Sequence, residues 1–216
     1  MDTDILFQKN AARDILSGLE IISPHCILAG GAPRDWFLGR KANDLDFYFS
    51  VEEGLTHRAV RGQLEQVLPK NVELLKGKDF PVDPMYKHME NLKRIWYLEY
   101  KGIPVQLIQM KSAPDVFGVV DKMSCSICKV WWKNGDIVPE KDFILTLTTK
   151  YMFLNEGYTW EDLHPQKMEQ RFKGEFHRAT KKQAETRFFN KAISEARERI
   201  RATKIDEKVG GEYDEN

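Results

Sequence analysis

The sequence contains few cysteines, and they are not arranged to build a disulfide framework. Only Cys26, Cys125 and Cys128 are cysteine among 216 residues. An odd number of thiols without a secretory leader argues against a secreted, disulfide-stapled protein. Cys125 and Cys128 form one C-x-x-C pair, but a zinc site would need a second pair of ligands, and none is suitably spaced nearby. We therefore interpret this pair, which lies in an apolar stretch, as small core residues.

The sequence also lacks a long hydrophobic run and a surplus of charge of either sign. No stretch approaches the roughly 20 apolar residues that a membrane span needs. The acidic start Met1-Asp2-Thr3-Asp4 lacks the basic region of a signal peptide. We expect a soluble, cytoplasmic protein with no membrane partner. The 33 basic and 33 acidic residues balance, so only the local distribution of charge can indicate a polyanionic partner.

What is present is the composition of a globular domain, with 42% hydrophobic and 31% charged residues. Hydrophobic periodicity predicts helices at 4–20, 32–38, 56–68 and 113–119, and strands at 25–29, 44–50, 94–100 and 103–110. The last two strands form a hairpin around Lys101-Gly102. We also expect a strand at 71–75 and a mobile loop at 77–90, whereas 123–132 reads equally as a strand or a buried helix.

From Asp142 onward the pattern is mainly helical, with Gly174 separating helices at about 160–173 and 175–204. The acidic end of the chain is typical of a disordered tail. The predicted fold is α+β, with a mixed β-sheet, helices on one side of it and a C-terminal helical extension. The expected domains are 1–140 for the sheet domain that carries the chemistry, 141–205 for the helical extension and 206–216 for the tail.

The most informative segment runs from Leu28 to Phe47, where a strand leads into Gly30-Gly31 and then into a helix. Glycines at such a turn let backbone N–H groups approach a phosphate closely. The N-terminus of the new helix adds a dipole that favours anions. Arg34 lies in the first helical turn, from which its guanidinium can fork onto phosphate oxygens. The segment therefore predicts a phosphate-binding turn.

Asp44 and Asp46 follow that turn with one residue between them. Residues two apart on a strand point to the same face, so the two carboxylates lie side by side and repel each other. A hard divalent cation such as magnesium offsets the repulsion and also binds phosphate oxygens. A phosphate-binding turn facing two acids is what metal-assisted nucleotidyl transfer requires, with one ion activating the attacking hydroxyl and another stabilising the departing pyrophosphate.

Each fragment also has a structural interpretation. A lone Gly-Gly is more often a simple turn, and a lone Asp-x-Asp is more often a solvated strand edge or a loop. Their order, with Arg34 between them and with Asp46 flanked by the apolar Leu45 and Phe47, favours the functional interpretation.

In this order the residues resemble the signature of the polymerase-β-type nucleotidyltransferase superfamily, in the branch of bacterial poly(A) polymerases and tRNA CCA-adding enzymes. That branch carries Gly-Gly-x-x-Arg-Asp, Leu-x-Gly-Arg and Asp-x-Asp, which are Gly30 to Asp35, Leu38 to Arg40 and Asp44 to Asp46 here. The resemblance implies a template-independent, magnesium-dependent transferase with a two-ion site. Asp44 and Asp46 would be catalytic metal ligands, and Gly30, Gly31, Arg34 and Asp35 would bind a nucleoside triphosphate.

The sequence departs from that branch in three ways. In the counterpart of a later pocket segment, Val120 to Ile127, only Asp121 is matched, which makes Asp121 a further nucleotide-binding candidate. Gln106 occupies the expected place of a third carboxylate and cannot act as a base; Glu99 on the preceding strand is the fallback. The chain after the catalytic region is also far shorter than the neck, body and tail domains of full CCA-adding enzymes.

The segment 166–204 carries twelve Lys or Arg against five Glu, interleaved with Phe172, Phe176, Phe188 and Phe189. One interpretation is an RNA-binding arm, because basic residues contact phosphates and aromatic rings stack on bases. The alternative, favoured by spacings such as Glu195–Arg199, is a pair of amphipathic helices that pack their phenylalanines on the core.

Other polar and aromatic residues carry weaker signals. Trp131 and Trp132 are adjacent on a possible strand, so at most one of them can face a given pocket. The histidines show no ligand spacing, and we assign no chemistry to His57, His88, His164 or His177.

Three hypotheses follow. The first is a transferase that moves a nucleoside monophosphate onto an RNA 3′ end and releases pyrophosphate. The second is a transferase that modifies a small molecule or a protein, as antibiotic-modifying enzymes and some toxins of the superfamily do. The third is a non-catalytic nucleotide-binding module, which the presence of Gln106 allows.

Overall fold

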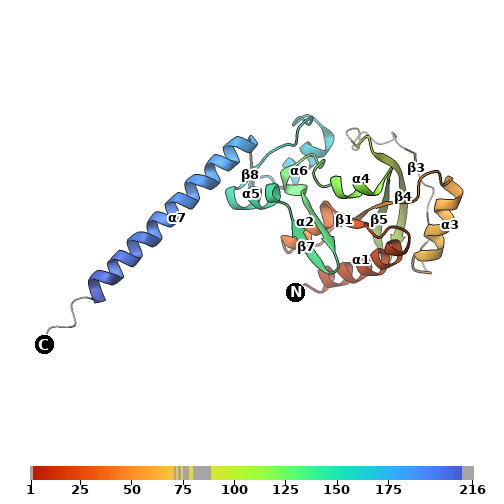
Figure 1. Ribbon diagram of the computed structural model, residues 1–216, viewed down its shortest axis with the longest axis horizontal. Coiled ribbons are helices and arrows are strands. Elements are labelled where there is room, and N and C mark those ends of the chain that lie inside the picture. Colours follow the sequence, from red (N-terminus) through yellow and green to blue (C-terminus); the bar gives the residue numbers. More distant parts are fainter. Residues whose placement is uncertain (1, 71, 73, 75–77, 80–88, 211–216) are drawn as a thin grey trace.

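The computed structural model describes residues 2–70, 72, 74, 78, 79 and 89–210 (Figure 1). A mixed sheet lies at its centre, and a long C-terminal helix extends away from it. The helices are α1 (Thr3–Ile22), α2 (Gly31–Phe37), α3 (His57–Val67), α4 (Ala113–Gly118), α5 (Lys141–Thr149), α6 (Leu163–Arg171) and α7 (Lys181–Gly210), with a 3₁₀ turn at Ser126–Cys128. The strands are β1 (Ile27–Ala29), β2 (Leu45–Ser50), β3 (Lys78–Asp79), β4 (Leu92–Tyr100), β5 (Ile103–Met110), β6 (Val130–Lys133), β7 (Asp136–Pro139), β8 (Tyr151–Met152) and β9 (His177–Arg178).

The main sheet has the strand order β3-β4-β5-β2-β1-β6-β7. Its central strands β2 and β5 are parallel, whereas the other neighbours are antiparallel. The predicted α+β class with a mixed sheet flanked by helices is confirmed. The parallel pairing sets Asp46 directly beside Gln106, so the register of the two central strands positions the acid segment.

Helices cover both faces of the sheet, and the expectation of helices on one side alone was wrong. Successive residues of a strand point to opposite faces, and on β2 both faces are apolar. Phe47 and Phe49 pack into a core with α1 and α3. Tyr48, between them, packs into a second core that includes residues of α4 and α6. A strand buried on both sides needs a cover on both sides, which the added helices provide.

The elements predicted before residue 119 are largely confirmed, with ends that shift by at most two residues. At the β4–β5 hairpin, Lys101 and Gly102 have φ of 53° and 73°, the left-handed values that a two-residue type I′ turn requires. The predicted strand at 71–75 and loop at 77–90 lie mostly outside the described residues. Within them, Lys78–Asp79 pairs with β4 as β3.

The second half of the chain differs more from expectation. The segment 123–132 is neither one strand nor one helix, because a 3₁₀ turn at Ser126–Cys128 precedes β6. Its cysteines are buried, which confirms them as core residues. Strands β7, β8 and β9 were not predicted. Gly174, with φ of 83°, separates α6 from α7 as expected, but α7 continues through Gly210, so the start of the predicted tail is helical.

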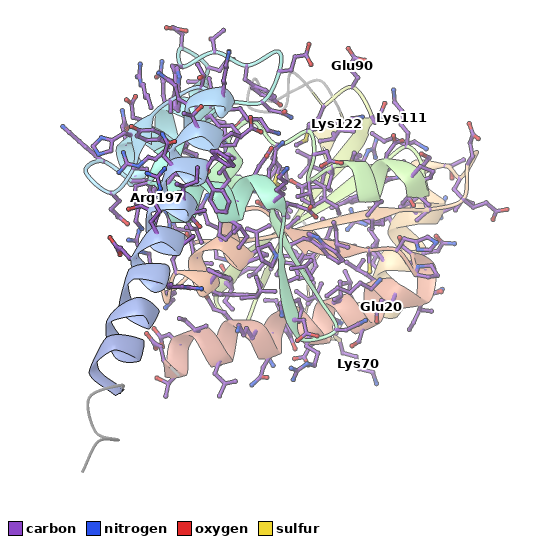
Figure 2. The ribbon with its side chains drawn as sticks, turned by 60° about the vertical axis from the view of Figure 1, so that its left-hand side comes forward. Glu20, Lys70, Glu90, Lys111, Lys122 and Arg197 are labelled. Carbon is purple, nitrogen blue, oxygen red and sulfur yellow. The ribbon has the colours of Figure 1, made fainter. Side chains whose placement is uncertain are left out.

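Helix α7 is held to the rest of the molecule near its first turns. Asp142 of α5 accepts one hydrogen bond from Lys129 and forms an ion pair with Lys181, both at 2.9 Å, and Ala184 is fully buried. Farther along, the helix projects away from the sheet, as Figure 1 shows and as the labelled Arg197 marks in Figure 2. Among the described helices, none combines the length and apolar character that crossing a bilayer requires.

Candidate active site

The turn between β1 and α2 brings backbone close to an acid. Gly30 has φ of 81°, a left-handed conformation that glycine adopts without the steric cost of a side chain. Its N–H donates to the carbonyl of Val130 at 2.9 Å, which fixes the turn to β6. A Cβ on Gly31 would lie 3.8 Å from Oδ1 of Asp44 and 3.9 Å from Nη2 of Arg34. The predicted turn, arginine and first acid therefore meet at one place.

The two acids lie at the start of the central strand β2. Asp44 immediately precedes the strand and Asp46 is its second residue, so both carboxylates are on the face that α6 covers. Both are half-buried. Oδ1 of Asp46 is buried and has no hydrogen-bond partner among the described residues. Such an oxygen loses its hydration without replacement, which costs free energy unless a cation or a donor arrives.

The electrostatics of the pair agree with this geometry. Burial raises the pKa of Asp44, although the charges of Lys167 and Arg34 oppose the shift. Burial and the neighbouring charge of Asp44 raise the pKa of Asp46 to about 8. Neither acid belongs to an ion pair within the described part of the chain. Two neighbouring carboxylates with raised pKa values repel each other when both are ionised, and a divalent cation bound between them would offset this repulsion.

The acids open into a pocket of about 590 Å³. Its walls come from two parts of the chain that are far apart in sequence. The sheet side contributes Gly30, Gly31, Arg34, Asn43, Asp44, Asp46, Tyr48, Tyr97 and Gln106, and the later side contributes Met123, Ser124, Cys128, Tyr158, His164, Lys167, Met168, Gln170 and Arg171; Met89 also lines the pocket.

Arg34 reaches the pocket but is already engaged. Its Nε and Nη2 donate to the carboxylate of Asp35 at 2.9 and 3.2 Å. Arg171 of α6 also donates to Asp35, at 2.7 Å. Asp35 is 1% exposed and does not line the pocket, so it anchors two arginines beneath the pocket wall. The resemblance named Asp35 as a nucleotide-binding residue, whereas in the structure its carboxylate contacts Arg34 and Arg171 and lies outside the pocket lining.

One face of α6 supplies pocket residues that the sequence did not assign to this site. His164, Lys167 and Arg171 are spaced three and four residues apart, so they share one side of the helix, and all three line the pocket. Nδ1 of His164 lies 2.6 Å from Oγ of Ser124. Burial and the charges of Arg34 and Lys167 lower the pKa of His164 to about 4, so this imidazole is neutral at pH 7. No local motif of the sequence indicates these contacts.

Two residues singled out from the sequence lie elsewhere. Asp121 is exposed and is not part of the pocket lining; its backbone carbonyl accepts a hydrogen bond from Asn155. Glu99 is also exposed and outside the pocket. Gln106, by contrast, lines the pocket beside Asp46. The pocket therefore contains two carboxylates and the side-chain amide of Gln106, with the amide at the position expected for a third carboxylate.

A second, broader hollow of about 1160 Å³ lies between α7 and the β8–β9 pair. It is lined by His177, Arg178, Lys182, Arg187 and Lys191 together with neutral residues, and no carboxylate of the described residues lines it. Arg187 stacks over the ring of Tyr151 at 4.6 Å. The basic segment is therefore split, because α6 faces the acid pocket whereas α7 faces this hollow.

The phenylalanines of the basic segment behave in two ways. Phe172 and Phe176 are 1% and 8% exposed, as the packing interpretation predicted. Phe188 and Phe189 on α7 are 45% and 65% exposed, so for them that interpretation was wrong. Helix α7 projects from the molecule and has no core to cover these rings. Of the tryptophan pair, Trp132 is buried, Trp131 donates to Glu140 at 3.1 Å, and neither lines the acid pocket.

With this geometry described, the chain can be compared with known proteins. A family model described as Gabija anti-defense 2 family protein (Gad2) matches residues 6–150. That range contains the glycine turn and both acids but ends before α6. No curated protein matches the chain in sequence.

Among solved structures, the fold is that of CCA-adding enzymes. An apo form of a CCA-adding enzyme gives a TM-score of 0.53 at 16% identity, over 89% of this chain and 45% of that one. A complex with CTP gives 0.52 at 16%, over 83% and 40%. The Thermotoga maritima enzyme complexed with tRNA gives 0.51 at 15%, over 85% and 41%. At these identities the likeness establishes the nucleotidyltransferase fold, and this chain spans less than half the length of those enzymes.

Proposed function

We propose that this chain, which belongs to the Gabija anti-defense 2 family, is a nucleotidyltransferase that moves a nucleoside monophosphate from a triphosphate to an acceptor hydroxyl and releases pyrophosphate. One observation carries the proposal. Two half-buried carboxylates face a pocket beside the Gly30-Gly31 turn, and one of them has a buried oxygen without a hydrogen-bond partner in the part of the chain that the structure describes. A purely structural acid pair would be expected to find hydrogen-bond donors.

The donor set fits magnesium. Asp44 and Asp46 would hold it, because both are oxygen ligands with raised pKa values that a divalent cation would lower. Bound there, magnesium supplies the charge that activates a hydroxyl and stabilises pyrophosphate, and the superfamily resemblance implies two such ions. Gln106 can contribute an amide oxygen beside Asp46 but no charge. The chemistry therefore depends on two carboxylates.

The remaining pocket residues position the nucleotide. The N–H groups of the Gly30-Gly31 turn can approach phosphate because no Cβ intervenes. Arg34 forms part of the pocket wall, but the carboxylate of Asp35 binds its guanidinium and offsets most of its charge. The neutral His164 and Ser124 offer hydrogen-bonding groups to a base or sugar without adding charge. In this proposal, the protein contributes orientation and the exclusion of water, which account for much of the catalysis in phosphoryl transfer.

For the acceptor, we propose an RNA 3′ end. The hollow beside α7 supports this choice because it is lined by cations without a carboxylate, a charge distribution suited to a polynucleotide backbone. Such substrates would be met in the cytoplasm. The family description favours a second acceptor. Because the family is described as acting against the Gabija defence, the nucleotide could be transferred onto a protein of that defence.

The test is incubation of the full chain with each α-labelled nucleoside triphosphate and magnesium, with total RNA or with purified Gabija proteins as acceptor. Labelled RNA supports the first acceptor, and labelled protein supports the second. Asp44→Asn and Asp46→Asn should each abolish transfer, with a loss of about a thousandfold or more. Glu99→Gln, which changes an exposed carboxylate outside the pocket, is the matched control and should retain activity.

Binding of triphosphate without transfer to either acceptor would instead support the third hypothesis, a nucleotide-binding module. Transfer that persists at the parental rate in the Asp44→Asn, Asp46→Asn double variant would disprove the assignment of these acids.

A further inference from the structure

The arginine of the motif is not available as a simple phosphate clamp. Arg34 is buried, and its side chain is only 3% exposed. Two of its nitrogens donate to Asp35, and Nη1 lies 3.3 Å from the sulfur of Cys128 and 3.0 Å from that of Met168. A triphosphate would have to compete for a guanidinium whose donors are already used. The pocket therefore needs another cation to balance a polyanionic ligand.

Lys167 is placed to be that cation. It lines the acid pocket from α6, its residue is exposed to solvent, and the ion pairs of the described residues do not include it. A flexible, hydrated lysine carries a point charge that can follow phosphate oxygens.

The rest of α6 is arranged to leave this charge available. The single carboxylate of the helix, Glu169, points to another side, where Arg178 donates two hydrogen bonds to it. Arg171, one turn beyond Lys167, is held by Asp35 at 2.7 Å. The pocket face of α6 therefore presents one cation held in place and one free of carboxylate partners within the described chain, with no acid between them.

We infer that Lys167 binds the phosphate chain of the nucleotide and that Arg171, positioned by Asp35, is a second donor to it. This inference rests on the proposed function, because it concerns the same pocket. It also means that the nucleotide site is completed by α6, which lies beyond the matched residues 6–150. The cations of α6 then serve the nucleotide rather than the acceptor, which leaves the acceptor to the hollow beside α7.

The test is calorimetric titration of the full chain with inorganic tripolyphosphate in the presence of magnesium. Lys167→Gln should weaken binding by about tenfold, the effect of losing one charge-assisted hydrogen bond. Lys167→Arg should restore most of the affinity. Lys173→Gln is the control, because Lys173 is an exposed lysine of the same region that does not line the pocket. Its affinity should equal that of the parent.

The inference is overturned if the parent does not bind tripolyphosphate, or if Lys167→Gln binds it as tightly as Lys173→Gln does. Because Lys167 is exposed, all three variants should unfold at the same temperature as the parent, and this check separates lost binding from lost folding. Tripolyphosphate carries no nucleoside to transfer. A chain that binds it through Lys167 but labels no acceptor would support this inference and contradict the proposed transferase activity.

Discussion

Oδ1 of Asp46 remains buried without a partner in the described chain, and Asp44 adds a second carboxylate to the same pocket. In the absence of a cation, the two carboxylates therefore destabilise the folded state. Substitutions that stabilise such a site commonly reduce function. The pKa direction gives the sign. The folded-state pKa of Asp46 lies above its ordinary 3.8, at about 8, so the contribution of this group to stability is present below the ordinary value and is lost as pH rises toward 8.

Asp46→Asn should therefore stabilise the chain at high pH in a chelator. Asparagine keeps the shape and has no proton to lose, so the variant should gain about 1 kcal/mol above pH 8 and much less near pH 5. Urea unfolding at the two pH values measures the difference. Glu99→Gln serves as the control and should show no gain. A variant that is less stable than the parent at high pH would show that Asp46 is structurally satisfied.

The sequence predicted the residues of the site that lie close together along the chain. Gly30, Arg34, Asp44 and Asp46 fall within a short segment, and the structure brings them to one pocket. Lys167 and His164 could not be found in this way, because they line the same pocket as two acids that lie more than a hundred positions earlier in the chain. The implied role of Asp121 rested on one matched residue, and the chain turns it outward.

At the scale of elements, the attachment of α7 depends on Asp142. This carboxylate is 8% exposed, and burial alone would raise its pKa. Hydrogen bonds from Lys181 and Lys129 outweigh burial and lower it. Lys129 is itself 6% exposed, so the loss of its partner would leave a buried ammonium unpaired, which is costly. The stability of the junction between α5, the segment before β6 and α7 therefore depends on the charge of Asp142.

Asp142→Asn should destabilise the chain by about 3 kcal/mol in urea unfolding and speed hydrogen exchange in the first turns of α7. Glu65→Gln breaks the exposed pair with Arg61 on α3 and should cost only about 0.5 kcal/mol. Equal effects of the two substitutions would contradict the role given to the buried junction.

The elements that the sequence predicted are those with a clear hydrophobic periodicity or with turn residues at their ends. Alternating residues identified β2, and the Lys101-Gly102 pair identified the β4–β5 turn. Strands β8 and β9 contain two residues each, too few to show alternation, and they form only because tertiary contacts bring them together. The exposed Phe188 and Phe189 show the same limit, since periodicity cannot reveal whether a helix has a partner.

At the scale of the whole molecule, the site belongs to two regions of the chain. The sheet supplies the acids and the glycine turn, while α6 supplies the opposite wall. The boundary predicted at residue 140 stays a prediction, but residues from both sides of it line the acid pocket. The fold is that of far longer enzymes, and here one short helix closes the pocket. A chain of this size can therefore offer both an acid pair and a basic wall.

The most direct test of the account is the binding of Mn²⁺, as a paramagnetic substitute for magnesium, to the full chain followed by electron paramagnetic resonance. We expect binding that is lost in Asp44→Asn and in Asp46→Asn, is retained in Glu99→Gln, and weakens as pH falls below the raised pKa of Asp46, about 8, because the proton competes with the metal. Mn²⁺ binding that is unchanged in both acid variants would contradict the claim that these two carboxylates share a divalent cation.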